Sequence, residues 1–134
     1  MGLYSHLVLP RLLDFAMKFD EATKVREQVI PAARGVVLEV GIGSGLNLPF
    51  YTSAVTKLYG VDPSSELLAM AQKKIAGLSF PVTLFNRSAD RIPLPDHSVD
   101  TGVVTWSLCS IPNPSAALKE MRRLLKPGGS LIFV

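Results

Sequence analysis

The chain is poor in the residues that build disulfides and metal sites. It has one cysteine, Cys109, and two histidines, His6 and His97, among 134 residues. A single cysteine cannot form an intramolecular disulfide, and we therefore expect a reducing, cytoplasmic environment. The few histidine, cysteine and acidic side chains form no cluster with metal-ligand spacing, so we expect no metal site.

Long apolar runs and a strong net charge are also missing. No apolar run reaches the roughly 18 residues that span a bilayer, and the N-terminus lacks the basic region of a secretory signal. The formal net charge is +3, too weak to indicate a nucleic-acid partner without a localised patch. Hydrophobic residues make up 48% of the sequence, which is typical of a globular chain. We expect one soluble domain over residues 1–134.

Short apolar segments alternate with helical patterns along this chain. Residues 11–30 place apolar side chains three and four positions apart, with Arg26 among the polar residues between them, which predicts an amphipathic helix in an N-terminal helical segment, 1–34. Strands are predicted at residues 36–40, 56–61, 81–85, 99–106 and 130–134. Helices are predicted at residues 46–51, at 63–77, and from 113 to a turn at 126–129. The alternation predicts an α/β fold, a doubly wound, mostly parallel Rossmann-like sheet of about five strands with helices on both faces.

The first predicted strand runs into a glycine turn. Gly41, Gly43 and Gly45 follow Val40 at every second position. Glycine adopts positive φ and leaves room for a ligand beside the backbone. Backbone N–H groups in such a turn bind anionic or polar groups, and ligands of doubly wound sheets lie at this end of the strands. We therefore predict a cofactor site here, the alternative being a plain strand-to-helix turn.

Two acids narrow the choice of cofactor. Asp62 ends the second predicted strand, 21 residues after Gly41, where an acid accepts hydrogen bonds from ribose hydroxyls. Its alternative role is to cap the helix that follows Pro63. The third glycine comes one residue earlier than in a dinucleotide fingerprint, and Glu39 precedes the first glycine by two residues. A carboxylate there repels a diphosphate and attracts a cofactor with a cationic end.

These segments resemble the class I S-adenosylmethionine-dependent methyltransferases. The similar segments are residues 38–45 (first motif), 60–64 (second motif), 88–95 (the loop that meets adenine), 100–111 (the fourth strand) and 123–131 (the helix-to-fifth-strand motif). The resemblance covers residues 35–134. Residues 45–51 resemble the ubiquinone/menaquinone-biosynthesis and methyltransferase-like thiol methyltransferase branch.

The resemblance implies S-adenosylmethionine as the cofactor. It implies that the three glycines let the backbone approach the methionine and ribose portions. Glu39 would orient the cationic amino-acid end, and Asp62 would hold the ribose hydroxyls. Asn47 is a further candidate, for the methionine carboxylate.

The resemblance also implies residues for the adenine ring and the transferable methyl group. Pro63, Ala89 and Asp90 would contact adenine, with Asp90 accepting a hydrogen bond from its exocyclic amine. Trp106 and Ser107 would lie beside the methyl group. No catalytic residue is assigned, because the sulfonium is already activated and transfer depends mainly on alignment.

We therefore expect methyl transfer to a small or lipophilic acceptor. One alternative is a cofactor-binding module without turnover. Another is an NAD-dependent oxidoreductase, which the early third glycine and Glu39 disfavour. Members of the resembled family continue beyond the fifth strand with a helix and an antiparallel strand pair. We accordingly expect a truncated domain without this C-terminal strand pair, whose fifth-strand edge pairs with a second copy to form a homodimer.

Overall fold

The computed structural model describes residues 20–134, apart from the side chain of Cys109. Helix α2 (Asp20–Val29) opens this part of the chain and is followed by a single 3₁₀ turn at Ile30–Ala32. The predicted helix over residues 11–30 is thus confirmed in its second half, while its first half and His6 lie outside the described residues.

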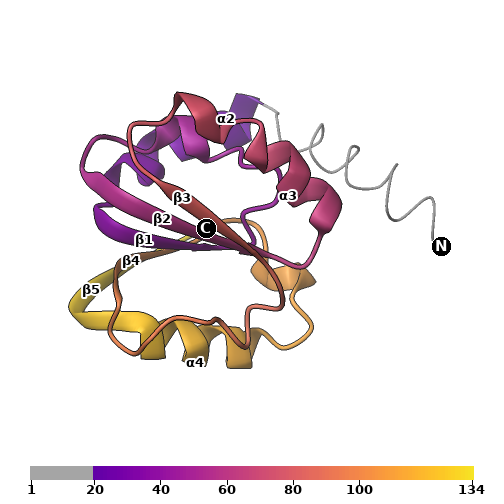
Figure 1. The fold of residues 1–134 in the computed structure, drawn as a ribbon, viewed down its shortest axis with the longest axis vertical. Coiled ribbons are helices and arrows are strands. Elements are labelled where there is room, and N and C mark those ends of the chain that lie inside the picture. Colours follow the sequence, from indigo (N-terminus) through magenta and orange to yellow (C-terminus); the bar gives the residue numbers. More distant parts are fainter. Residues whose placement is uncertain (1–19) are drawn as a thin grey trace.

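A five-stranded parallel sheet forms the centre of the molecule (Figure 1). Its strands are β1 (Gly35–Val40), β2 (Val55–Asp62), β3 (Val82–Asn86), β4 (Val99–Val104) and β5 (Leu125–Phe133). Their order is β3-β2-β1-β4-β5, and every neighbouring pair is parallel. The predicted doubly wound α/β fold is confirmed.

Helices cover both faces of the sheet. Helices α2 and α3 (Ser65–Gln72) lie on one side and α4 (Pro114–Leu124) on the other (Figure 1). Because side chains alternate along a strand, Val37 packs into the core under α2 and α3, whereas Leu38 packs into the core under α4. Both side chains are fully buried. Strand β1 is therefore covered on both faces. It is also the third of the five strands in the sheet order, so its carboxyl end lies near the middle of the molecule.

Several predicted boundaries shift for local reasons. The predicted helix at 46–51 is a single 3₁₀ turn, Leu48–Phe50, and the predicted helix at 63–77 comprises α3 and a 3₁₀ turn at Ile75–Gly77. The fourth strand ends at Val104 rather than at residue 106, because Trp106 has a φ of 51°. A further 3₁₀ turn, Leu108–Ser110, leads toward α4.

Strand β5 begins before the predicted turn at 126–129 and continues after it. Val99 pairs with Leu125 and Thr101 pairs with Ser130, so the four residues between them bulge out of the ladder. Gly128 in this bulge has a φ of 81°. The predicted end of the helix is confirmed within two residues, since α4 ends at Leu124. The predicted turn at 126–129 is instead a bulge within β5, so the prediction placed the start of this strand too late. Within residues 20–134, no helix is both long and apolar enough to cross a membrane.

Candidate functional site

Two adjoining hollows lie at the carboxyl ends of β1, β2 and β4. The larger has a volume of about 300 Å³ and the smaller about 170 Å³. Gly41, Asp62 and Ser107 line both, so the two hollows form one elongated site. The site lies where the strand order reverses between β1 and β4, the usual ligand position in a doubly wound sheet.

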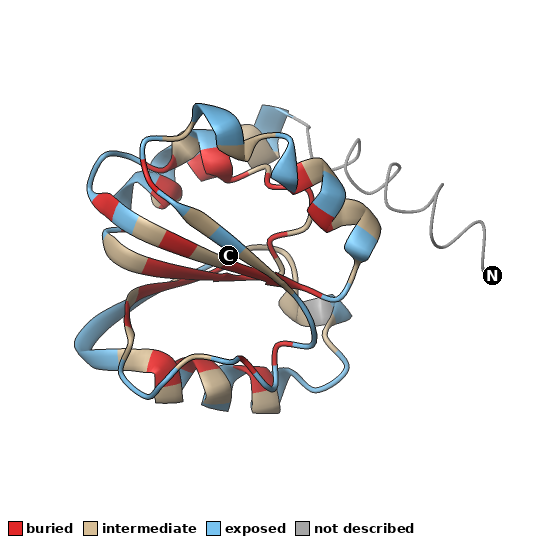
Figure 2. Ribbon diagram, viewed as in Figure 1, coloured by how far each residue is buried: buried red, intermediate tan, exposed pale blue. Residues whose placement is uncertain are grey.

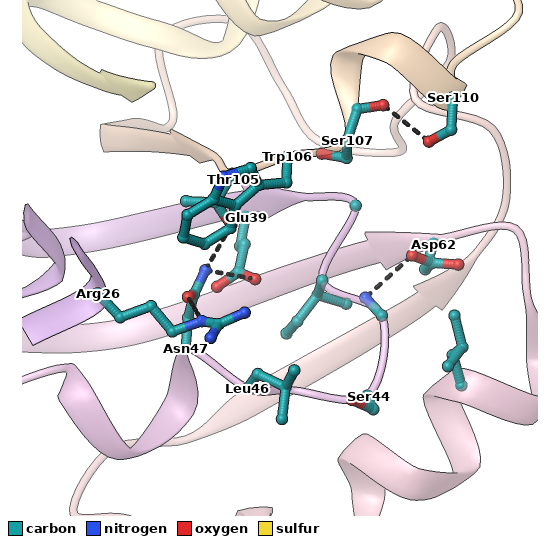
Figure 3. Close-up of a pocket in the computed structure, with 14 residues that line it drawn as sticks. Arg26, Glu39, Ser44, Leu46, Asn47, Asp62, Thr105, Trp106, Ser107 and Ser110 are labelled. Atoms are coloured by element: carbon teal, nitrogen blue, oxygen red, sulfur yellow. Dashed lines mark hydrogen bonds between the residues drawn. The ribbon is translucent and has the colours of Figure 1, made fainter. Parts of the chain in front are cut away.

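The glycine turn forms the floor of the larger hollow (Figure 3). Its three glycines all have positive φ, between 56° and 82°. A Cβ atom on Gly41 would overlap the side chain of Ser107, so glycine is required there for close packing. Gly45 instead packs against Leu48 and Ala71 and lines neither hollow. The structure therefore places Gly45 in the turn, behind the ligand-facing surface.

Asp62 fastens this turn to the end of β2. Its Oδ2 accepts a hydrogen bond from the Gly43 N–H at 2.9 Å, and its Oδ1 accepts one from the Ser64 N–H at 2.9 Å. Burial raises the pKa of the Asp62 carboxyl, and these two hydrogen bonds oppose the shift. The cap of α3 is Ser64, whose hydroxyl accepts from the Leu67 N–H. The alternative prediction, that Asp62 caps this helix, is therefore wrong.

Glu39 is a buried acid at the opposite end of the larger hollow. It is 1% exposed. Its Oε1 accepts from the Tyr51 hydroxyl at 2.5 Å and its Oε2 accepts from the Asn47 amide at 3.2 Å. Burial raises the pKa of Glu39 to about 8, against the opposing effects of these bonds and the charge of Arg26. Burial and the neighbouring Glu39 also raise the pKa of Tyr51.

Arg26 from α2 completes this end of the site. Its Nε donates to the Asn47 Oδ1 at 3.1 Å, and its guanidinium lies 4.9 Å from the centre of the Trp106 ring (Figure 3). The Asn47 amide also donates to the Thr105 hydroxyl at 3.0 Å. Side chains from α2, the glycine turn and the end of β4 thus meet in one buried polar network.

Sequence analysis did not identify three residues of this network: Arg26, Tyr51 and Thr105. It placed Arg26 among the polar residues of the predicted helix. Arg26 is instead the buried residue of α2. Arg26 lies four residues after Ala22 and four before Ile30, so helical spacing puts it on the same face as these apolar residues. That spacing was an available signal. No comparable pattern links Tyr51 to Glu39 or Thr105 to Asn47, because these residues come from separate segments.

The smaller hollow has apolar walls together with polar and ionisable side chains, among them Asp62, Arg87 and Ser88. Pro63 and Ala89 line it together with Val61, Ile111 and Pro112. Asp90 directly follows Ala89 in the sequence, but its side chain is exposed and lines neither hollow. The other predicted site residues, Glu39, Gly43, Asn47 and Trp106, line the larger hollow. Nine of the eleven predicted residues therefore border the elongated site, with Gly45 and Asp90 as the exceptions.

A parallel sheet with a glycine turn after β1 and an acid at the end of β2 defines an α/β domain that binds a nucleoside-containing cofactor. Comparison with known protein families makes this class more specific. Residues 38–133 match the family model described as a methyltransferase domain, and this chain belongs to that family.

Individual relatives agree with this assignment. The chain is 35% identical over 127 residues to a phosphatidylethanolamine N-methyltransferase of Cereibacter sphaeroides, an alignment that covers 92% of this chain and 62% of the relative. It is 27% identical over 131 residues to a ubiquinone/menaquinone biosynthesis C-methyltransferase of Geotalea daltonii, covering 94% and 56%. The chain thus spans about three fifths of the length of these relatives. The predicted resemblance to the ubiquinone/menaquinone-biosynthesis branch is confirmed.

A solved structure shares the fold. A SAM-dependent methyltransferase from Aquifex aeolicus superimposes with a TM-score of 0.67 at 25% sequence identity, covering 88% of this chain and 68% of that protein. The predicted Rossmann-like methyltransferase fold therefore agrees with both the sequence family and the structural neighbour.

Proposed function

We propose that this chain binds S-adenosylmethionine and transfers its methyl group to a small or lipophilic acceptor. The observation that carries this proposal is the elongated site, in which the larger hollow is lined by Arg26, Glu39 and Asn47 and the smaller by Pro63, Ala89 and Ile111. S-adenosylmethionine has a matching division into a charged amino-acid end and a planar base, joined by a ribose. The comparisons provide no support for the alternative of an NAD-dependent oxidoreductase.

The charges of the larger hollow suit this cofactor. Its ionisable lining residues among residues 20–134 are Arg26, Glu39 and Asp62. S-adenosylmethionine carries a sulfonium, an ammonium and a carboxylate, and therefore one net positive charge. With both acids ionised, the hollow has one net negative charge, so the two are complementary. Glu39 then faces the ammonium. Asp62 uses the lone pairs left beside its two backbone bonds to accept the ribose hydroxyls.

The apolar walls of the smaller hollow suit an adenine ring. Pro63 and Ala89 supply walls against which the ring packs. In this proposal the exposed Asp90 accepts from the exocyclic amine, and Trp106 and Ser107 border the methyl group, since both line the larger hollow. The Ser107 hydroxyl donates to the Val40 carbonyl at 3.3 Å, which fixes this turn to the end of β1.

When bound, the cofactor supplies an activated methyl group on its sulfonium. The residues of this chain would orient it: the glycine turn would lie against it, and Glu39 and Asp62, which line the larger hollow, would hold its two polar portions. Such alignment is the main requirement of an in-line transfer. We assign no general base, because no residue is placed against an acceptor.

The acceptor class rests on the relatives. Their names specify phosphatidylethanolamine for one and ubiquinone and menaquinone biosynthesis for the other. A lipophilic acceptor is therefore the class we propose for this chain. Residues 1–34 would act as an N-terminal helical segment of the same single domain, in the cytoplasm, where its lone Cys109 stays reduced.

Ligand titration tests the proposal. Trp106 is the only tryptophan and lines the site, so its fluorescence reports binding alongside calorimetry. We expect S-adenosylmethionine and S-adenosylhomocysteine to bind and NAD to bind at least tenfold more weakly. Tight NAD binding without a response to the sulfonium compound would overturn the proposal.

A transfer assay then separates the enzyme from a binding module. The acceptors are vesicles containing phosphatidylethanolamine, a demethylated quinol and an aliphatic thiol, each with a labelled methyl donor. We expect label in at least one lipophilic acceptor. Binding of the donor without transfer to any acceptor would support the alternative of a cofactor-binding module without turnover.

We further propose a homodimer formed through the β5 edge. β5 is the last strand in the sheet order, so one of its edges has no neighbouring strand among the described residues. Leu131 and Phe133 on this strand are 46% and 62% exposed. An apolar strand edge with unpaired backbone groups is a template for pairing with another chain.

A further inference from the structure

The first half of the glycine turn is fastened to the end of β2. The Gly41 N–H donates to the Val61 carbonyl at 2.8 Å. The Gly43 N–H donates to the Asp62 carboxyl at 2.9 Å. The second half begins at Ser44, which is 4% exposed and lines the larger hollow (Figure 3). Because a glycine stands on either side of Ser44, the backbone here has wide conformational freedom, and its contacts decide how well it is ordered.

A lysine that follows α3 holds this second half. The Lys74 Nζ donates to the Ser44 carbonyl at 2.7 Å. The Gly45 N–H, which belongs to the same peptide group, donates to the Ile42 carbonyl at 3.0 Å. Both polar atoms of the Ser44–Gly45 peptide are therefore bonded, which fixes its orientation. A hydrogen bond from an ammonium is stronger than one between neutral groups, so the Lys74 contact is the stronger of the two.

The packing of Gly45 brings the turn within reach of this lysine. Gly45 has a φ of 82°, and a Cβ atom on it would lie 3.2 Å from the Cβ of Ala71, on α3. Glycine thus permits the close approach of the turn to this helix. Lys74 comes three residues after Ala71, and its backbone N–H donates to the Ala71 carbonyl at 2.9 Å, so it lies beside the point of contact. Gly45, which lines neither hollow, therefore serves the contact with Lys74.

The ammonium of Lys74 bonds a segment that is distant in the sequence. A cation near the end of a helix ordinarily interacts with the last carbonyl groups of that helix or with water. The preceding residue, Lys73, is exposed, whereas Lys74 is half-buried and bonds a residue 30 positions earlier in the chain. The contact thus joins the end of α3 to the ligand-facing turn.

We propose that Lys74 is a positioning residue that holds the glycine turn in the conformation that receives the cofactor. This inference rests on the proposed function, since it assumes that S-adenosylmethionine lies against the turn. Without the lysine, the Ser44–Gly45 peptide can rotate, and only part of the population keeps the surface that the ligand meets. The apparent affinity falls in proportion to that part, although Lys74 itself lines neither hollow.

The test measures binding and local order in the same variant, Lys74→Met, which removes the ammonium and keeps an unbranched side chain. We expect calorimetry to show about 5- to 20-fold weaker binding of S-adenosylhomocysteine, as for a lost hydrogen bond from a charged group. In the ligand-free chain, we expect NMR to show that the Gly45 amide exchanges its hydrogen at least about fivefold faster. The amide of Val103, in the buried strand β4, should change by less than about twofold.

Three further variants make the result specific. Lys73→Met removes a cation from the exposed neighbouring position, and we expect it to leave both measurements as in the wild type. Lys74→Arg keeps a cationic donor, and we expect it to keep the affinity within about threefold of the wild type. Lys74→Gln also removes the charge and replaces Lys74→Met should that variant melt without a cooperative transition.

The contrary outcomes are distinct. Faster exchange at Gly45 with unchanged affinity would overturn the inference, because the order of the turn would not matter for binding. Equal acceleration at Gly45 and Val103 would also overturn it and make Lys74 a residue of general stability. A loss of affinity in Lys73→Met or Lys74→Arg as large as in Lys74→Met would overturn it as well. A wild-type chain that does not bind S-adenosylhomocysteine would overturn the proposed function itself, and this inference with it.

Discussion

Glu39 combines nearly complete burial with hydrogen bonds from two uncharged donors, Tyr51 and Asn47. Its pKa of about 8 means that the carboxyl keeps its proton at neutral pH when no ligand is bound. A cationic group placed beside it would favour ionisation. The acid that the sequence suggested as a partner for a cationic ligand is thus also a group that exchanges a proton in the physiological range.

The stability of the ligand-free chain should therefore depend on pH. The pKa of Glu39 is about 8 in the folded chain, against 4.5 for an ordinary glutamate side chain, so between these pH values the folded state holds one more proton than the unfolded state. The free energy of unfolding then falls as pH rises from about 5 to about 8. We expect Glu39→Gln to flatten this dependence in thermal melts. The lowered pKa values of Asp100 and Glu120 act below this window.

A matched variant checks the assignment to Glu39. Glu27 is an exposed acid on α2 that lines neither hollow, and we expect Glu27→Gln to leave the slope between pH 5 and 8 as in the wild type. Equal slopes in the wild type and in Glu39→Gln would contradict the prediction.

At the residue scale, sequence patterns predicted the side chains that belong to contiguous motifs. Glu39 and Asp62 lie at strand ends, where the fold itself places them at the site. Tyr51 and Arg26 reach Glu39 from different elements, and only tertiary packing brings them together. Their partners depend on side-chain contacts that spacing along a sequence does not encode.

Among the elements, α4 holds in place the segment after β3, whose first residues border the smaller hollow. Arg123 on α4 donates to the carbonyl oxygens of Leu94 at 2.9 Å and of Ile92 at 3.1 Å. Glu120, one turn earlier, accepts from the Ile92 N–H at 2.7 Å and pairs with Arg123 at 2.6 Å. Two side chains of one helix thus fix the backbone a few residues after Ala89.

Removing the contacts of Arg123 with this segment should weaken binding of an adenine ring in the smaller hollow. We expect Arg123→Met to reduce the affinity for 5′-deoxy-5′-methylthioadenosine, which has the base but lacks the amino-acid end, by about three- to tenfold. Calorimetry measures the affinity. Arg122→Met is the control, because Arg122 is the exposed neighbour on the same helix. Equal affinities in the two variants would show that Arg123 does not position the base-binding segment.

The ends of the strands were predicted less accurately than the strands themselves. The alternation of apolar segments predicted all five strands, since each strand contributes apolar residues to one or both of the two cores. It missed the bulge in β5, because whether the chain rejoins the ladder before or after a Pro-Gly-Gly turn depends on pairing with β4. It likewise extended the fourth strand to Trp106, whose positive φ lies outside the strand region.

For the whole molecule, the sheet has a well-covered centre and two edges of different character. Strands β1 and β4 are buried, whereas most residues of β5 are exposed (Figure 2). The other edge strand, β3, has three half-buried and two exposed residues. The apolar residues on β5 make its edge the one more suited to pairing with a second copy.

Mass measurement in solution tests this dimer. We expect light scattering after size exclusion to give twice the chain mass of 14.5 kDa. Phe133→Lys should shift the population to the monomer, because a lysine on an exposed apolar edge opposes strand pairing. Thr83→Lys is the matched control, since it adds the same charge at an exposed position of β3, the opposite edge. A wild-type monomer would refute the dimer, and equal loss of the dimer in both variants would attribute association to net charge rather than to the β5 edge.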